Sequence, residues 1–172
     1  MGVITVGIAD CQVSNQAGDT LVTHALGSCI GVVVHDAAAG VGGLLHILLP
    51  ESSLDREKAR AQPFMFADTG IAQLFQMVQT KGADKKRMSV RLLGGAQVMD
   101  PNGVFNIGKR NHLACRKALW AAGAMVHAEE VGGNISRTVR LDVATGGLLW
   151  NSGAGPAREL PVKGGAVCRS AS

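Results

Sequence analysis

Cys29 and His46 are the two residues whose types and spacing most favour covalent chemistry. Cys29 closes the segment THALGSC over residues 23–29, and His46 follows seventeen residues later in a second apolar segment. The thiolate is the attacking form of cysteine, but a free cysteine is mostly thiol at neutral pH and needs a base beside it. An imidazole can take that proton and hold the resulting ion pair. The two residues together therefore predict a cysteine hydrolase.

Three further residues could complete such a site. Gly27 permits a sharp corner before the thiol, and the backbone N–H groups of Gly27 and Ser28 could then point toward a developing oxyanion. The Thr23 hydroxyl could orient the imidazole as the third member of a triad. Structural roles remain open for each residue, since Cys29 could be a core cysteine, His46 a buried histidine bonded to a backbone carbonyl, and Thr23 an ordinary strand threonine.

A predicted hairpin gives the strongest reason to expect that Cys29 and His46 lie close together. Residues 30–35 and 41–49 are continuous apolar runs of strand length, and residues 36–40 have the composition of a turn. Such a turn folds the two strands antiparallel. Cys29 and His46 are nearly symmetric about the centre of the turn, so the hairpin is expected to bring them together.

A metal site is the competing use of the same region. His24 and His35 could join Cys29 and His46 around zinc, but zinc sites usually show tighter local spacing. His24 would also point to the face opposite Thr23 if both lie in a strand. We therefore expect no metal and no cofactor. The chain has four cysteines and no CxxC pair, which indicates neither a zinc framework nor a disulfide scaffold.

The composition narrows the class of protein. The length of 172 residues suits one domain, and the net charge of +4 allows an acidic partner. The chain has no Tyr, four Phe and two Trp, without the basic and aromatic interleaving that stacks bases, so nucleic acid is not expected as a partner. The N-terminal residues predict no signal peptide, and no apolar run has membrane-spanning length. We expect a cytoplasmic protein with no direct membrane insertion.

The periodicity predicts an α+β domain over residues 1–150. Helical spacing of Ile71, Leu74, Phe75 and Val78 predicts one helix that ends near Gly82, and a second helix fits residues 111–122. The polar residues 51–62 are expected to form a surface loop, and the Gly, Ala, Pro and Ser-rich residues 151–172 a flexible tail. Strands are predicted at residues 3–8, 20–25, 30–35, 41–49, 88–93, 124–130, 138–142 and 148–150.

An ordered set of motifs resembles the chemoreceptor glutamine deamidase family, CheD. The motifs are residues 23–29, 43–50, 66–70, 94–99 and 107–111, then Gly132, Gly133, Arg137 and the hairpin at residues 142–146. They cover about residues 5 to 150 in order, which makes the set more specific than any one piece. His24 stands where many members carry a small residue, so the resemblance leaves open whether Thr23 or His24 completes the site.

The resemblance implies a fold and a reaction. The fold is a single-domain α/β sandwich with two β-sheets and outer helices, resembling the catalytic domain of cytotoxic necrotizing factor toxins. The reaction is hydrolysis of selected glutamine side-chain amides to glutamate on the cytoplasmic domains of chemotaxis receptors, with receptor methyl esters as a further substrate of some members. By position, Cys29 is the nucleophile, His46 the general base and acid, and Thr23 the orienting hydroxyl. A CheC-type phosphatase is the partner that the resemblance suggests.

Two other classes of function remain open at this point. A chemotaxis adaptor could use the same face to bind CheC or receptors without catalysis. A thiol peptidase or a transglutaminase-like enzyme could use the same nucleophile and base on a different acyl substrate.

Overall fold

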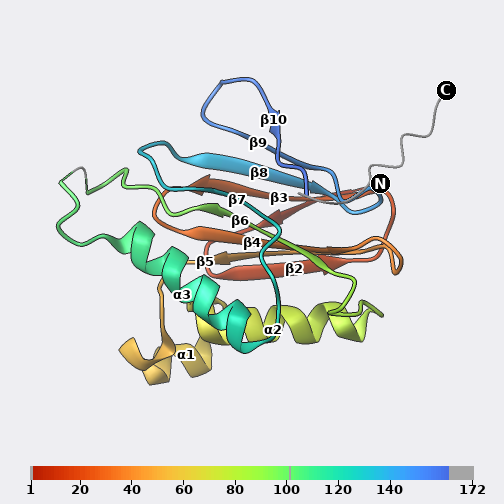
Figure 1. Ribbon diagram of the computed structural model, residues 1–172, viewed down its shortest axis with the longest axis horizontal. Coiled ribbons are helices and arrows are strands. Elements are labelled where there is room, and N and C mark those ends of the chain that lie inside the picture. The colour runs from red at the N-terminus through yellow and green to blue at the C-terminus, as the bar shows by residue number, and fades with distance from the viewer. Residues whose placement is uncertain (1, 101, 163–172) are drawn as a thin grey trace.

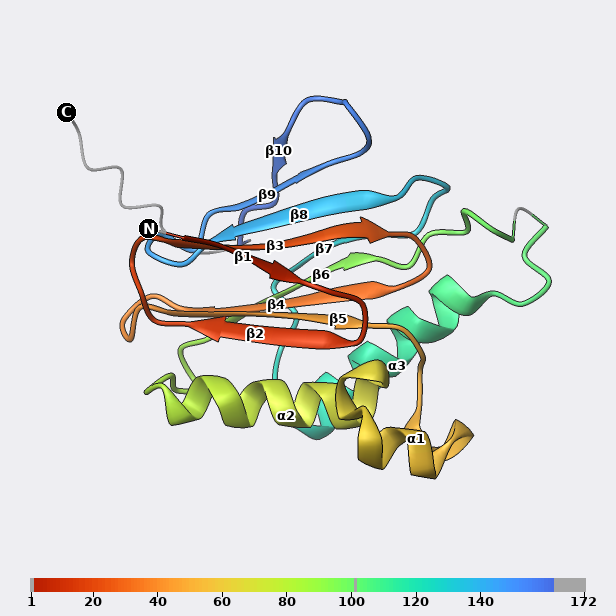
Figure 2. The same cartoon turned by 180° about the vertical axis from the view of Figure 1, so that it is seen from behind.

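Two mixed β-sheets stack face to face, and helices cover the outer face of one of them (Figures 1 and 2). The computed structural model describes residues 2–100 and 102–162. The first sheet has the order β1 (Gly2–Val6), β3 (Asp19–Leu26), β8 (Arg137–Asp142), β9 (Leu148–Asn151) and β10 (Arg158–Glu159). The second sheet has the order β2 (Asp10–Ser14), β5 (Val41–Ile47), β4 (Ile30–Asp36), β6 (Ser89–Gly94) and β7 (Ala128–Val131). The predicted two-sheet sandwich with outer helices is therefore confirmed.

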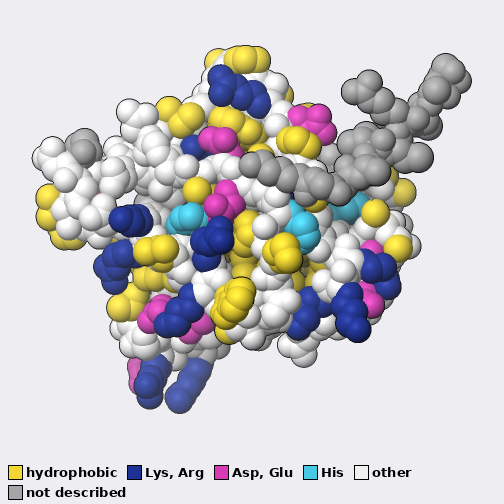
Figure 3. Space-filling view, in the orientation of Figure 1, with side chains coloured by type: hydrophobic (Ala, Val, Ile, Leu, Met, Phe, Trp, Pro, Cys, Tyr) yellow, Lys and Arg dark blue, Asp and Glu magenta, His cyan; other side chains and the backbone are white. Residues whose placement is uncertain are grey.

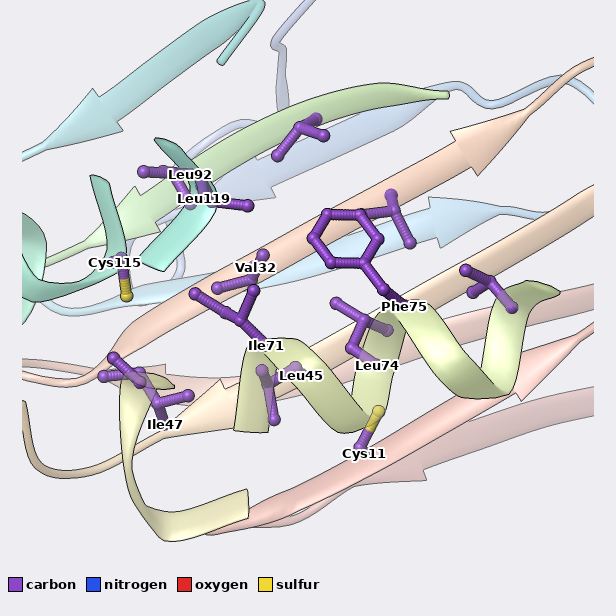
Figure 4. Close-up of a cluster of buried hydrophobic side chains, with 14 of the residues drawn as sticks. Cys11, Val32, Leu45, Ile47, Ile71, Leu74, Phe75, Leu92, Cys115 and Leu119 are labelled. Atoms are coloured by element: carbon purple, nitrogen blue, oxygen red, sulfur yellow. The ribbon is translucent and has the colours of Figure 1, made fainter. Parts of the chain in front are cut away.

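The second sheet is buried on both faces, which explains the continuous apolar runs of β4 and β5. Val33 and Leu44 face the first sheet, whereas Val32, Val34 and Leu45 face the helices. The helix-side cluster is drawn in Figure 4, where side chains from α2 (Ala67–Thr80) and α3 (Ile107–Ala121) pack on the strands. The sheet-to-sheet cluster encloses the strand ends that carry the candidate site.

The hairpin of β4 and β5 has the antiparallel register that the turn predicted. Ile30 pairs with Ile47, and Asp36 pairs with Val41 beside the turn. The Asp36 carboxylate accepts hydrogen bonds from the backbone N–H groups of Ala38 and Ala39, which fixes the turn.

Residues 51–62 are not a loop as predicted. They contain a 3-10 turn η1 (Ser52–Leu54) and a short helix α1 (Arg56–Ala61), followed by a second turn η2 (Pro63–Met65). The Asp55 carboxylate accepts the Lys58 N–H and caps α1. Only Ala59 of α1 is buried, so the segment has no apolar period by which the sequence could indicate a helix.

The other differences concern short or irregular elements. The prediction missed β2, and of the strand expected at residues 124–130 only the end is strand, as part of β7. Helix α3 starts at Ile107 rather than at Asn111. The Asp100 carboxylate accepts the backbone N–H groups of Val104, Phe105 and Asn106 and shapes the loop that leads into this helix.

The expected tail at residues 151–172 is described only to residue 162. Within that part, β10 pairs antiparallel with β9, and the buried Arg91 side chain donates to the Leu160 carbonyl. The chain up to residue 160 is thus folded onto the first sheet, and residues 163–172 lie outside the described residues. No helix in the described ranges is long and apolar enough to span a lipid bilayer.

Candidate active site

A β-bulge at the end of β3 shapes the corner that carries Cys29. The pairing of β3 with β8 shifts between Thr23 and Leu26, and Ala25 takes a left-handed conformation with φ of 55°. Thr23 and Leu26 are both fully buried, whereas His24 and Ala25 are exposed. Strand alternation thus points Thr23 inward and His24 outward, as expected from the sequence, and the bulge that follows brings Leu26 back to the buried face.

Cys29 and His46 lie on the same face of the second sheet, in diagonal positions of the hairpin. Gly31 is opposite His46 in the ladder, and Cys29 precedes Gly31 by two residues. The Cys29 side chain belongs to the cluster between the sheets and is 7% exposed, and His46 is fully buried. The structure thus brings the candidate nucleophile and the candidate base to one place beneath the first sheet.

Thr23 reaches His46 across the gap between the sheets and fixes the state of the imidazole. Thr23 Oγ1 lies 2.8 Å from His46 Nδ1 and 2.8 Å from the Val6 carbonyl oxygen. A carbonyl only accepts, so the single hydroxyl proton is donated to Val6 and the hydroxyl oxygen accepts from Nδ1–H. In the neutral imidazole the lone pair then resides on Nε2. His46 Nε2 is buried and has no hydrogen-bond partner in the described chain.

Burial keeps both reacting groups neutral at rest. Desolvation lowers the pKa of His46 to about 4, although the negative charge of Asp10 acts in the opposite direction. Desolvation also raises the pKa of Cys29, against a smaller lowering by its own backbone N–H. Both shifts favour the neutral forms, a thiol at Cys29 and an uncharged imidazole at His46. No hydrogen bond joins Cys29 to His46 in the described structure.

The backbone around Cys29 leaves N–H groups for an oxyanion. The Gly27 N–H donates to the Ala25 carbonyl at 2.9 Å, so the predicted donor at Gly27 is already occupied. Neither Ser28 N–H nor Cys29 N–H donates to another residue in the part of the chain that is described. Of the predicted donors Gly27 and Ser28, only Ser28 has a free N–H, and the free N–H of Cys29 lies next to it.

Glycines allow β6 and α3 to approach the nucleophile corner closely. Gly95 N–H donates to the Cys29 carbonyl at 2.8 Å, and Ala96 N–H donates to the Gly27 carbonyl at 2.8 Å. Gly94 has a φ of +111°, and a Cβ there would collide with the Cys29 carbonyl oxygen. A Cβ at Gly108 would likewise collide with Gly95. The corner is thus held by backbone contacts that only glycine permits.

Asn111 is the site residue that the analysis of the sequence missed. Its Nδ2 donates to the Ser28 carbonyl at 2.9 Å and to the Leu48 carbonyl at 3.0 Å, which ties the nucleophile corner to the end of β5. Asn111 is fully buried on the apolar face of α3, one turn before Cys115. A polar residue at an apolar helix position was the available signal.

A small cavity of about 90 Å³ opens beside the corner. Its lining includes Ser28, Ala96, Met99, Phe105 and Ile107. The walls are mainly apolar, and Met99 and Phe105 are largely exposed. A substrate side chain that approaches Cys29 from this side would pass through an apolar opening.

His24 and His35, the other two histidines considered for a metal site, do not join Cys29 and His46. His35 Nε2 bonds to the Val143 carbonyl at 2.9 Å, and His24 is exposed. The described residues hold no group of three or more His, Cys, Asp or Glu side chains arranged to bind a metal ion.

Comparisons with known proteins give a consistent result. The family model described as CheD chemotactic sensory transduction matches residues 48–152. A probable chemoreceptor glutamine deamidase CheD of Solibacter usitatus is 49% identical over 166 residues, which cover 94% of this chain and 98% of that protein. A probable chemoreceptor glutamine deamidase CheD 1 of Syntrophus aciditrophicus is 49% identical over 160 residues, covering 93% and 100%.

Among solved structures, the crystal structure of Neisseria meningitidis protein NMB0706 is similar with a TM-score of 0.43 and 12% identity, covering 77% of this chain and 62% of that one. The family model and the two relatives match most of the sequence, and the chain belongs to the CheD family.

Proposed function

We propose that this protein is a chemoreceptor glutamine deamidase that uses Cys29 as nucleophile, His46 as base and Thr23 as orienting group. One observation carries the proposal: the buried Thr23–His46 contact leaves Nε2 as an unpartnered base on the face that also holds Cys29. The names of the relatives supply the substrate, which is a glutamine side chain of a chemotaxis receptor.

The reaction follows from these groups. His46 Nε2 takes the proton from Cys29 Sγ, and the thiolate attacks the Cδ carbonyl of glutamine. The N–H groups of Ser28 and Cys29 stabilise the oxyanion. Nε2–H then protonates the departing ammonia, which leaves a thioester on Cys29. Water gives its proton to Nε2 and cleaves the thioester to glutamate, and the proton returns to Sγ.

The same steps act on a receptor glutamate methyl ester, with methanol as the leaving group in place of ammonia. Both substrates form the same thioester, so ester hydrolysis belongs to the proposal as a second activity of one site. The proposal places the protein in the cytoplasm, where the receptor domains are, with a CheC-type phosphatase as a further partner.

Mass spectrometry of a receptor cytoplasmic fragment tests the proposal. Incubation with the protein is expected to convert specific glutamines to glutamate, and Cys29→Ala is expected to abolish the conversion with the fold intact. His46→Ala is expected to lose a similar amount of activity. The matched control is Cys11→Ala, because Cys11 is also a buried cysteine but lies in the cluster on the helix side of the second sheet.

Three outcomes would contradict the proposal. Full activity of Cys29→Ala would exclude the cysteine mechanism. Binding of the fragment without any conversion by the reduced wild-type protein would favour the adaptor. Cleavage of the peptide chain, or incorporation of an amine into glutamine, would indicate a peptidase or a transglutaminase.

A further inference from the structure

The solvent side of α3 carries large apolar side chains in unusual exposure. Trp120 is 86% exposed and Leu113 is 55% exposed, and they lie seven residues apart on one face of the helix. Leu54 of η1 is 55% exposed beside Leu113, and Met125, just after α3, is 74% exposed beside Trp120. We define the α3 face as these four apolar side chains together with the basic side chains between and beside them, Arg110, Arg116 and Lys117.

Two hollows lie along this face. One, of about 300 Å³, is lined by Pro50, Leu54, Arg110, Leu113 and Lys117 among others. The other, of about 370 Å³, is lined by Arg116, Trp120 and residues 123–126. Leu113 and Trp120 are two helical turns apart, which is about 10 Å along the axis. A partner helix that packs along α3 would present apolar side chains at this spacing on a single face.

The charges on the α3 face are mainly positive. Arg110, Arg116 and Lys117 lie between and beside the apolar side chains, and Lys85 lies against the end of the helix at Ala122. Two carboxylates partly offset them, because Glu51 pairs with Lys117 at 3.1 Å and Glu129 pairs with Arg116 at 2.7 Å. Arg110 pairs with no carboxylate in the described residues. Figure 3 shows apolar side chains among Lys and Arg side chains over this side of the molecule. The charge complementary to this face is negative.

Helix α3 also leads to the proposed nucleophile. Its first turns hold Gly108 against Gly95 and Asn111 against the Ser28 carbonyl. Trp120 is nine residues beyond Asn111, which is about 14 Å along the helix. A helix bound on the α3 face can therefore continue toward Cys29 within a few turns.

We propose that the α3 face is a docking surface for an acidic amphipathic helix of the protein substrate, separate from the residues that react with the glutamine. This inference rests on the proposed function for the identity of the substrate. The apolar side chains of the substrate helix enter the two hollows, and its carboxylates meet Arg110, Arg116 and Lys117. Docking at Trp120 holds the helix while a glutamine two to three turns away enters the site.

Binding to a catalytically inactive protein separates docking from catalysis. In the Cys29→Ala background, Trp120→Ala is expected to raise the Kd for a receptor cytoplasmic fragment about tenfold or more, as for a central aromatic anchor. Lys117→Glu is expected to weaken binding as well, and added salt to weaken binding by the parent protein. The matched controls are Leu149→Ala, a half-exposed leucine on β9, and Lys81→Glu, an exposed lysine after α2, and neither should change the Kd.

In the active protein, Trp120→Ala is expected to raise KM for the fragment and to leave kcat within about twofold. Circular dichroism of each variant checks that the fold is kept. An unchanged Kd in both Trp120→Ala and Lys117→Glu would overturn the docking surface. A dimer of the protein alone that Trp120→Ala dissociates, with fragment binding unchanged, would assign the face to a second copy. Weakened binding in these variants together with no deamidation by the wild type would keep the docking surface and refute the proposed activity.

Discussion

Replacement of Thr23 by valine is the sharpest test of how His46 is held. Valine has nearly the shape of threonine and removes only the hydroxyl. Thr23 Oγ1 contacts the Val6 carbonyl oxygen and His46 Nδ1, at 2.8 Å each. In Thr23→Val the buried Nδ1–H no longer has the acceptor that selects the tautomer with a free Nε2.

The size of the effect follows from the cost of unpaired buried groups. An unsatisfied buried polar group costs about 1–3 kcal/mol. If misorientation of the imidazole raises the activation free energy by about 1.4 to 2.8 kcal/mol, kcat falls by about 10- to 100-fold. We expect a smaller loss than for Cys29→Ala or His46→Ala, because water or a rotated ring partly replaces an orienting group. The unfolding free energy should fall by about 1–3 kcal/mol, since the buried Nδ1–H is left unpaired.

The assay compares deamidation rates of Thr23→Val and Thr23→Ser, each beside its thermal stability. Serine keeps the hydroxyl and loses only a methyl group, so it should restore most of the rate. The reasoning is refuted if Thr23→Val retains the wild-type kcat, or if Thr23→Ser loses as much rate as Thr23→Val at equal stability.

Four further predictions concern pH and packing. Because burial lowers the pKa of His46 to about 4, the acid limb of kcat/KM should lie near pH 4, and a limb near pH 6.5 would contradict it. The unfolded chain protonates this histidine first, so the free energy of unfolding should fall by about 3 kcal/mol between pH 6.5 and pH 4, and a urea titration of His46→Gln should lack this part of the slope. Gly94→Ala should abolish activity and lower the melting temperature, since its Cβ would meet the Cys29 carbonyl, whereas Gly40→Ala, with open space around a similarly positive φ, should lower only stability. Gly31→Ala places a Cβ 3.0 Å from Leu26 Cδ1 and should reduce kcat at a stability cost of about 1–3 kcal/mol, which calorimetry and initial rates can separate.

The hairpin and the two long helices were predictable because their residues repeat a pattern that burial imposes. Residues 30–35 and 41–49 are apolar throughout, since β4 and β5 are covered by a sheet on one face and helices on the other. The period of α2 shows one buried face. In contrast, β10 and α1 bury almost nothing, so the sequence carries no apolar pattern for them.

The site was predictable only where it depends on local chain geometry, and not where it depends on how the sheets and helices pack. The hairpin brings Cys29 toward His46 through local chain geometry, which spacing can indicate. The contact between Thr23 and His46 depends on how the two sheets stack, which spacing does not determine. Strand alternation was enough to predict that His24 faces away from Thr23, but nothing in residues 20–26 indicates the bulge and the left-handed Ala25 that shape the corner before Cys29. Asn111 is 65 residues beyond His46 and reaches the corner only through the packing of α3.

The division of the site between two sheets links the packing of the core to the proposed chemistry. The proposed base lies in the second sheet and the proposed nucleophile directly before its strand β4, whereas the proposed orienting hydroxyl lies in the first sheet. Thr23 and His46 therefore keep their 2.8 Å contact only while the side chains between the sheets, Leu26 and Leu44 among them, hold the spacing. A change of a few tenths of an ångström in that spacing lengthens this hydrogen bond but leaves the hairpin that carries Cys29 and His46 intact. Large-to-small substitutions between the sheets should thus lower the deamidation rate before they unfold the protein. Substitutions of the same kind in the helix-side cluster should lower stability without this early loss of rate.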